Sequence, residues 1–180
     1  MKTGMSLIIR LVVSIGLCAL LGGWLSPPRA TARFSKEDEE KERMVSVRKA
    51  LPAADRFERV GSGGFRYDVG YQGDSRVGAV FQVDGNGYGG PMLLVVGIDQ
   101  EGKVVEVLLV AHNETPALWS KQTDQDFRAQ FRGKTGPFIL KKDEPSGNLD
   151  AVTSATISCR GIAGAVNEAL RIFKKEWGRK

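Results

Sequence analysis

The chain is poor in the residues that build metal and iron–sulfur centres. Its 180 residues include one histidine, His112, and two cysteines, Cys18 and Cys159. Two cysteines cannot supply the four thiolates of an iron–sulfur cluster, and with Cys18 inside an apolar segment they imply no disulfide framework. A lone histidine without a cysteine or carboxylate at ligand spacing is more often a structural hydrogen-bonding group than a metal ligand. The sequence therefore predicts no metal site.

Several functional classes are excluded by motifs that the chain lacks. The glycine-rich run 87–90 precedes a strand-like segment instead of opening a helix, so it is not a dinucleotide-binding fingerprint. The sequence also contains no acid/base dyad. The net charge is +5, but the basic residues are scattered and form no nucleic-acid-binding motif. We therefore expect no catalytic residues and no nucleic-acid partner, and we interpret the charge as an aid to solubility and docking.

The N-terminal segment is long and apolar. Residues 7–25 form a run of about nineteen residues, enough to cross a bilayer if Arg10 reaches toward the headgroups. Lys2 and Arg10 lie in the short N-terminal tail and favour its retention in the cytoplasm. The competing interpretation is a secretory signal peptide, because Ala30-Thr31-Ala32 resembles a cleavage site. The residues alone leave both interpretations open.

Three parts are predicted along the chain: a membrane anchor over 1–28, a charged helical linker over 29–52 and one domain over 53–180. The linker contains a highly charged amphipathic helix from Ser35 to Leu51, which Pro52 ends. About 145 residues lie outside the apolar start, and this length suits a single domain with a real core.

The domain alternates between strand and helix patterns. Residues 57–83 alternate well enough to predict two or three short strands, and 92–98 with 104–110 form a hairpin around the turn 99–102. The run 93–96 is apolar on both faces, which favours a central strand covered on both sides. Short helical pieces follow over 117–131, then a short strand at 138–140 and a helix ending at Trp177. The expected fold is α+β, with a mainly antiparallel sheet flanked by helices.

The segment Asp150-Ala151-Val152-Thr153-Ser154-Ala155-Thr156 opens the last helix and carries three hydroxyl groups. Free backbone N–H groups and the positive end of the helix dipole gather at such a position, so a phosphate esterified to Thr156 would be stabilised there. The alternative is an ordinary serine or threonine cap.

Together with Gly87-Tyr88-Gly89-Gly90-Pro91 and the loop from His112 to Leu118, this segment resembles the FMN-binding domain family, and within it the G subunits of Rnf electron-transport complexes. The resemblance covers roughly residues 85–166. In that family the pattern Asp-x-x-(Ser/Thr)-(Gly/Ser)-Ala-(Thr/Ser) is recognised by a flavin transferase that uses FAD and magnesium. The resemblance implies covalent FMN, held by a phosphoester to Thr156, with Asp150 read by the transferase and Thr153, Ser154 and Ala155 completing the motif.

The resemblance also implies a second set of cofactor contacts, from His112, Glu114, Thr115 and Leu118 to the flavin ring. A carboxylate at Glu114 would orient the ring by accepting a flavin N–H, and its charge would disfavour the anionic reduced form. Without the resemblance, the loop is equally well interpreted as a solvated turn.

These observations predict a membrane-anchored electron-transfer subunit of an Rnf-type ion-translocating complex, with its flavin domain on the periplasmic side of the inner membrane. The implied partners are the membrane and iron–sulfur subunits of that complex and the flavin transferase. Two alternatives remain at this stage: an exported FMN-binding domain that serves an extracellular reductase chain, and a non-redox binding module in which Thr156 is only a cap.

Overall fold

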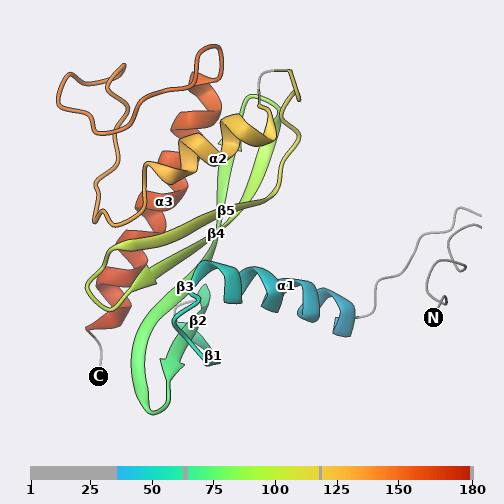
Figure 1. Ribbon diagram of the computed structural model, residues 1–180, viewed down its shortest axis with the longest axis vertical. Helices are drawn as coiled ribbons and strands as arrows, with labels where there is room; N and C mark the ends of the chain where they lie inside the picture. The colour runs from blue at the N-terminus through green and yellow to red at the C-terminus, as the bar shows by residue number, and fades with distance from the viewer. Residues whose placement is uncertain (1–35, 63–64, 118, 179–180) are drawn as a thin grey trace, which may run out of the picture. The chain divides into compact units, whose positions relative to one another are not determined.

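The computed structural model describes residues 36–62, 65–117 and 119–178, which form an antiparallel sheet with three helices (Figure 1). The α+β class and the mainly antiparallel sheet are confirmed. The predicted anchor over 1–28 lies outside the described residues. None of the described helices is both long enough and apolar enough to span a bilayer. The elements are α1 (Lys36–Ala50), β1 (Arg56–Ser62), β2 (Phe65–Gln72), β3 (Ser75–Gly87), β4 (Gly90–Asp99), β5 (Val104–Ala111), α2 (Lys121–Ala129) and α3 (Thr156–Trp177).

The five strands form a meander in which each strand pairs with the next in sequence, in the order β1-β2-β3-β4-β5. The alternating region that predicted two or three strands contains three. The predicted hairpin is β4–β5. At its turn, Gly102 takes a positive φ of 81°, and the Asp99 carboxylate accepts hydrogen bonds from the backbone N–H groups of Glu101 and Lys103. Glycine adopts this conformation without steric cost.

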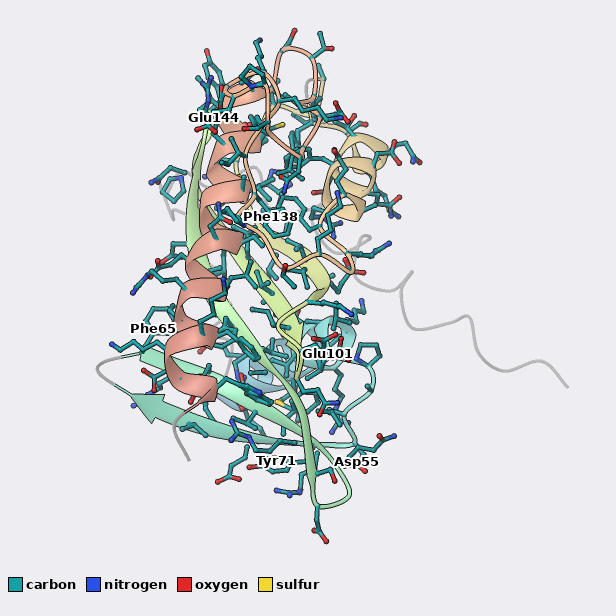
Figure 2. The ribbon with its side chains drawn as sticks, turned by 90° about the vertical axis from the view of Figure 1, so that its left-hand side faces the viewer. Asp55, Phe65, Tyr71, Glu101, Phe138 and Glu144 are labelled. Atoms are coloured by element: carbon teal, nitrogen blue, oxygen red, sulfur yellow. The ribbon has the colours of Figure 1, made fainter. Side chains whose placement is uncertain are left out.

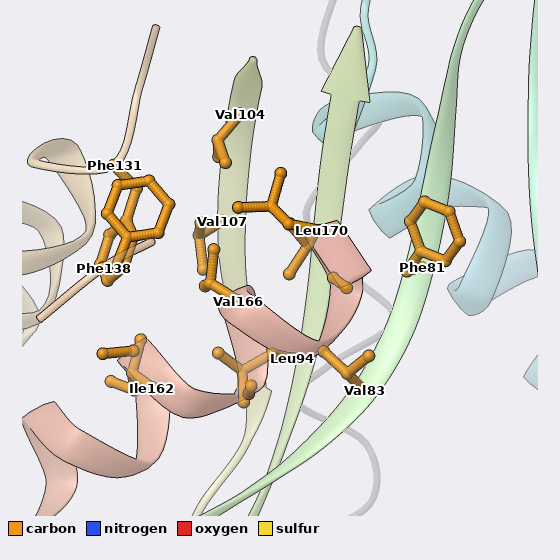
Figure 3. Close-up of a cluster of buried hydrophobic side chains, with 14 of the residues drawn as sticks. Phe81, Val83, Leu94, Val104, Val107, Phe131, Phe138, Ile162, Val166 and Leu170 are labelled. Carbon is orange, nitrogen blue, oxygen red and sulfur yellow. The ribbon is translucent and has the colours of Figure 1, made fainter. Parts of the chain in front are cut away.

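The sheet is covered on both faces. On one face α3 packs over the main core, where Phe81, Val83 and Leu94 of the strands meet Val166 and Leu170 of the helix (Figure 3). On the other face α1 forms a smaller cluster. Its buried members are Val47, Ala50, Leu51, Ala54, Val80 and Val95.

Successive residues of a strand point to opposite faces, so the apolar run of β4 serves both clusters. Leu94 and Val96 belong to the α3 side, and Val95 belongs to the α1 side. The prediction of a strand covered on both sides is confirmed, although β4 is the second strand from the edge and β3 is central. The charged helix expected over 35–51 is present as α1, and its last turns pack directly onto the sheet.

The short strand predicted at 138–140 is wrong. Residues 130–155 run as turns and irregular backbone, with one parallel bridge between Leu140 and Leu149. Phe138 is buried, and the side chain of Asn167 on α3 satisfies both of its backbone groups at 2.8 and 2.9 Å. A helix side chain therefore takes the place of a strand partner. Figure 2 shows Phe138 beside α3 and the loop of Glu144 near the N-terminal end of that helix.

The remaining helical predictions are confirmed in outline. Of the pieces expected over 117–131, the second is present as α2 (Lys121–Ala129), whereas Ala117 lies in a turn. The rings of Phe127 and Phe131 pack edge to face with centroids 5.5 Å apart. The predicted last helix is present as α3, and its buried residues include Ile162, Val166 and Phe173. Their spacing of three or four residues places them on one face.

Candidate functional site

Thr156 is the first residue of α3 and is not its cap. The N-cap is Ala155, which makes no side-chain hydrogen bond to the first turn. The interpretation of Thr156 as an ordinary cap is therefore wrong. The first N–H groups of a helix have no partner within it, so a cap without a side-chain acceptor leaves them available to water or a ligand. Thr156 itself is partly exposed, and Ile157 beside it is 50% exposed.

The segment before the helix is held through its backbone. The side-chain amide of Gln130 receives a hydrogen bond from the N–H of Asp150 at 2.7 Å and donates one to its carbonyl at 3.0 Å. Ser154 has a φ of 64°, in the left-handed region that favours glycine. Position 154 is the Gly/Ser position of the family pattern, and glycine adopts this conformation without steric cost. Thr153 and Ser154 are exposed and Ala155 is buried.

Three consecutive charged residues, Lys141 to Asp143, lie along the attachment segment. We call them the charged segment. Lys141 Nζ is 2.8 Å from the carboxylate of Asp150, Lys142 Nζ is 3.4 Å from Thr156 Oγ1, and the carboxylate of Asp143 accepts from Arg160 Nε at 2.8 Å. The hydrogen bond from Arg160 lowers the pKa of the Asp143 carboxyl, and the same bond raises the pKa of Arg160. The charged segment therefore contacts Asp150 at the start of the motif, Thr156 at its end and Arg160 one helical turn beyond it.

A buried polar network joins the loop after β5 to the first turn of α3. Glu114 is 8% exposed, and its carboxylate accepts from Ser158 Oγ at 2.6 Å and from the backbone N–H of Gly89 at 2.9 Å. The backbone N–H of Tyr88 donates to Ser158 Oγ at 3.3 Å. The β3–β4 turn, the loop and the helix start meet at this network. Glu114 is thus not part of a solvated turn.

The other predicted residues of this loop lie at the surface. His112 is exposed, and its Nδ1 accepts from the backbone N–H of Glu114 at 3.1 Å. Thr115 is exposed and its carbonyl accepts from Trp119 N–H at 2.9 Å. Leu118 lies outside the described residues. Among the described loop residues that were expected at the site, Glu114 is therefore the one that hydrogen-bonds to α3, the helix that begins at Thr156.

Two residues that contact the predicted site residues, Ser158 and Lys142, were not predicted from the sequence. Ser158 lies four residues before Ile162, so extending the apolar stripe of α3 backward places this polar residue on the buried face. That position could have identified it. Lys142 has no such pattern, because it lies in irregular chain. Cys159 is fully buried, and burial raises the pKa of its thiol, which keeps it protonated at neutral pH.

An antiparallel sheet backed by a long helix defines a small α+β domain, and a partly exposed threonine stands at the start of that helix. The FMN-binding domain family matches residues 87–171 of the chain. The G subunit of the proton-translocating ferredoxin:NAD(+) oxidoreductase complex of Clostridium ljungdahlii is 31% identical over 127 residues, which cover 69% of this chain and 68% of that protein. The chain belongs to the FMN-binding domain family.

A second relative is the G subunit of the ion-translocating oxidoreductase complex of Escherichia coli O157:H7, 34% identical over 119 residues. The match covers 61% of this chain and 57% of that protein, so the chain spans little more than half of this relative. The crystal structure of Shewanella oneidensis NqrC has the same fold, with a TM-score of 0.51, 16% sequence identity and 72% of each chain covered.

Proposed function

We propose that the chain is the FMN-carrying G subunit of an Rnf-type ion-translocating oxidoreductase complex, with the FMN phosphate esterified to Thr156. The family match and the named relatives support the class of protein. The observation that carries the attachment site is the position of Thr156, which starts α3 without capping it and is partly exposed.

The residues around Thr156 fit a phosphate group. Ala155 supplies no oxygen to the first turn, so the N–H groups there are available, and the positive end of the α3 dipole favours an anion. Lys142 adds a cation at 3.4 Å from the Thr156 oxygen. Bound FMN would supply one- and two-electron transfer, while the protein holds the phosphate end and orients the cofactor.

Attachment would be a group transfer from FAD. The Thr156 hydroxyl would displace AMP from the FMN phosphorus of FAD and release its proton, and the transferase would supply magnesium. Asp150 is accessible for recognition because its side chain is 70% exposed, although it pairs with Lys141. Asp150→Ala should slow labelling without removing the acceptor, and unchanged labelling kinetics would count against a recognition role.

The loop from His112 to Leu118 is proposed to lie against the flavin ring. The bond between Glu114 and Ser158 supports this, since Ser158 is two residues from Thr156. Glu114→Gln removes a negative charge near the ring and should raise the midpoint potential of the attached flavin in a redox titration. An unchanged potential would place the loop away from the ring.

The proposal includes an uncleaved N-terminal anchor, with the FMN domain outside the cytoplasm and the other membrane and iron–sulfur subunits as partners. The apolar run 7–25 and the basic residues of the N-terminal tail support it. Intact-mass analysis of protein isolated from membranes tests the anchor. A mature N-terminus at Arg33 would show cleavage after Ala32 and would exclude it.

The attachment site is tested with two matched threonine variants. Thr156→Val is nearly isosteric and should keep the fold, but it should lose the FMN mass increment after denaturation. Thr135→Val, at an exposed threonine outside the motif, should keep the increment. Both proteins are made alongside the flavin transferase. An FMN-sized increment that persists in Thr156→Val would show that the attachment residue is a different one.

A further inference from the structure

We propose that Lys142 is the counter-ion of the flavin phosphate at Thr156. It increases the rate of attachment, and it stabilises the folded protein that carries the attached group. This inference rests on the proposed function and adds a residue to its site. Lys142 lies outside the Asp150–Thr156 motif, fourteen residues before Thr156 in the sequence. The contact between its Nζ and Thr156 Oγ1, at 3.4 Å, is the observation from which the inference starts.

The position of Lys142 is set by the ion pairs of its two neighbours. Lys141 is paired with Asp150 at one end of the attachment segment, and Asp143 is paired with Arg160 one helical turn after Thr156. The backbone is also fixed nearby, because the N–H of Lys141 donates to the carbonyl of Leu149 at 2.9 Å. These contacts direct the residue between the two pairs, Lys142, toward the first residue of the helix.

The local charges favour a singly charged anion. Lys141 and Arg160 each form a salt bridge, whereas Lys142 Nζ has no carboxylate within 4.0 Å in the described part of the chain and attracts Asp143 only at longer range. A phosphodiester carries one negative charge at neutral pH, which the ammonium group of Lys142 can balance. The helix end adds roughly half a positive charge through its dipole. Lys142, with a full positive charge, therefore contributes more positive charge at Thr156 than the helix dipole does.

The geometry also suits the ester once it has formed. The non-bridging oxygens of a phosphoester lie one phosphorus atom beyond the ester oxygen. A lysine whose Nζ already contacts that oxygen reaches them by small rotations of its flexible side chain. During the transfer, charge builds up on the same oxygens as the threonine oxygen attacks phosphorus. A cation at this place lowers the free energy of the transition state of the transfer as well as that of the attached product.

The test uses the full chain with three substitutions and the flavin transferase with FAD and magnesium. Lys142→Gln removes the charge, Lys142→Arg keeps it, and Lys175→Gln removes the same charge from an exposed lysine in the last turn of α3. Two quantities are measured for each protein: the rate at which the FMN mass increment appears, and the change in Tm between unlabelled and labelled forms. Circular dichroism verifies the fold of each variant.

Lys142→Gln should be labelled up to about fivefold more slowly than the unsubstituted chain at low salt, and its Tm change on labelling should be lower, because an exposed ion pair contributes up to about 1 kcal/mol. The difference should shrink as salt screens the charge. Lys142→Arg and Lys175→Gln should behave as the unsubstituted chain does. Equal labelling rates and equal Tm changes in all four proteins would overturn the role of Lys142 while leaving Thr156 as the attachment site. Absence of any FMN increment in the unsubstituted chain would instead overturn the proposed function, and this inference with it.

Discussion

The hydroxyl of Ser158 donates a hydrogen bond of 2.6 Å to the carboxylate of Glu114, and both side chains are buried. The two residues are 44 positions apart in the sequence. Their bond ties the loop after β5 to the first turn of α3, two residues beyond Thr156. The position of the attachment turn relative to the sheet therefore depends on a buried carboxylate as well as on apolar packing.

The first prediction concerns the strength of this tie. Glu114→Ala leaves the hydroxyl of Ser158 and the N–H of Gly89 without their acceptor, and it should lower the free energy of unfolding by about 1–3 kcal/mol. Ser158→Ala should cost less than Glu114→Ala, because the carboxylate keeps the bond from Gly89. Urea unfolding of both single variants and the double variant gives the coupling energy, expected at about 1–2 kcal/mol. Additive effects of the two substitutions would show that the bond contributes nothing.

The second prediction compares two glycines of α3. A Cβ at Gly161 would collide with the backbone carbonyl of Asn86 on β3, whereas a Cβ at Gly164 meets no atom within 4 Å. Alanine usually stabilises a helix interior by about 1 kcal/mol relative to glycine. Gly164→Ala should therefore raise the free energy of unfolding by about 0.5–1 kcal/mol.

Gly161→Ala should instead lower the free energy of unfolding by about 1–3 kcal/mol, since the helix must move away from the sheet to admit the methyl group. Thermal and urea unfolding measure both variants, and each serves as the control for the other. Equal gains in stability from the two substitutions would mean that α3 does not approach β3 this closely.

The third prediction concerns pH. Asp68 on β2 is buried and pairs with Arg43 of α1 at 2.5 Å. Burial raises the pKa of the Asp68 carboxyl by more than the charge of Arg43 lowers it. A carboxyl whose folded pKa lies above its unfolded value binds its proton more tightly in the folded state. Its contribution to stability is thus full below the unfolded pKa and is lost as pH rises through the folded pKa.

Asp68→Asn removes this titration. The unsubstituted chain loses this contribution as pH rises, so the free energy of unfolding of Asp68→Asn minus that of the unsubstituted chain should increase from about pH 4 to pH 7. This window begins at the unfolded pKa of about 3.9. Urea unfolding at several pH values measures the difference. Asp74→Asn, at the exposed β2–β3 turn, is the matched control and should show no such trend. A difference that is independent of pH would contradict the raised pKa.

Local patterns in the sequence were enough to predict the main elements. The last helix follows from apolar residues every three or four positions, and the β4–β5 hairpin follows from two apolar runs around a turn with Gly102. These features depend on neighbours in the chain. The strand predicted at 138–140 failed because Asn167, about thirty residues away, satisfies the backbone of Phe138.

The α+β class, the family resemblance and Thr156 as the proposed acceptor could all be predicted from the sequence, because they depend on periodicity and on short contiguous motifs. Only the tertiary structure showed that Lys142 reaches Thr156 and that Ser158 bonds Glu114. Both contacts join residues from segments without a shared pattern, and a single side chain in irregular backbone leaves no periodic trace. Such contacts exist only once the sheet and α3 have packed and the charged segment is held by its own ion pairs.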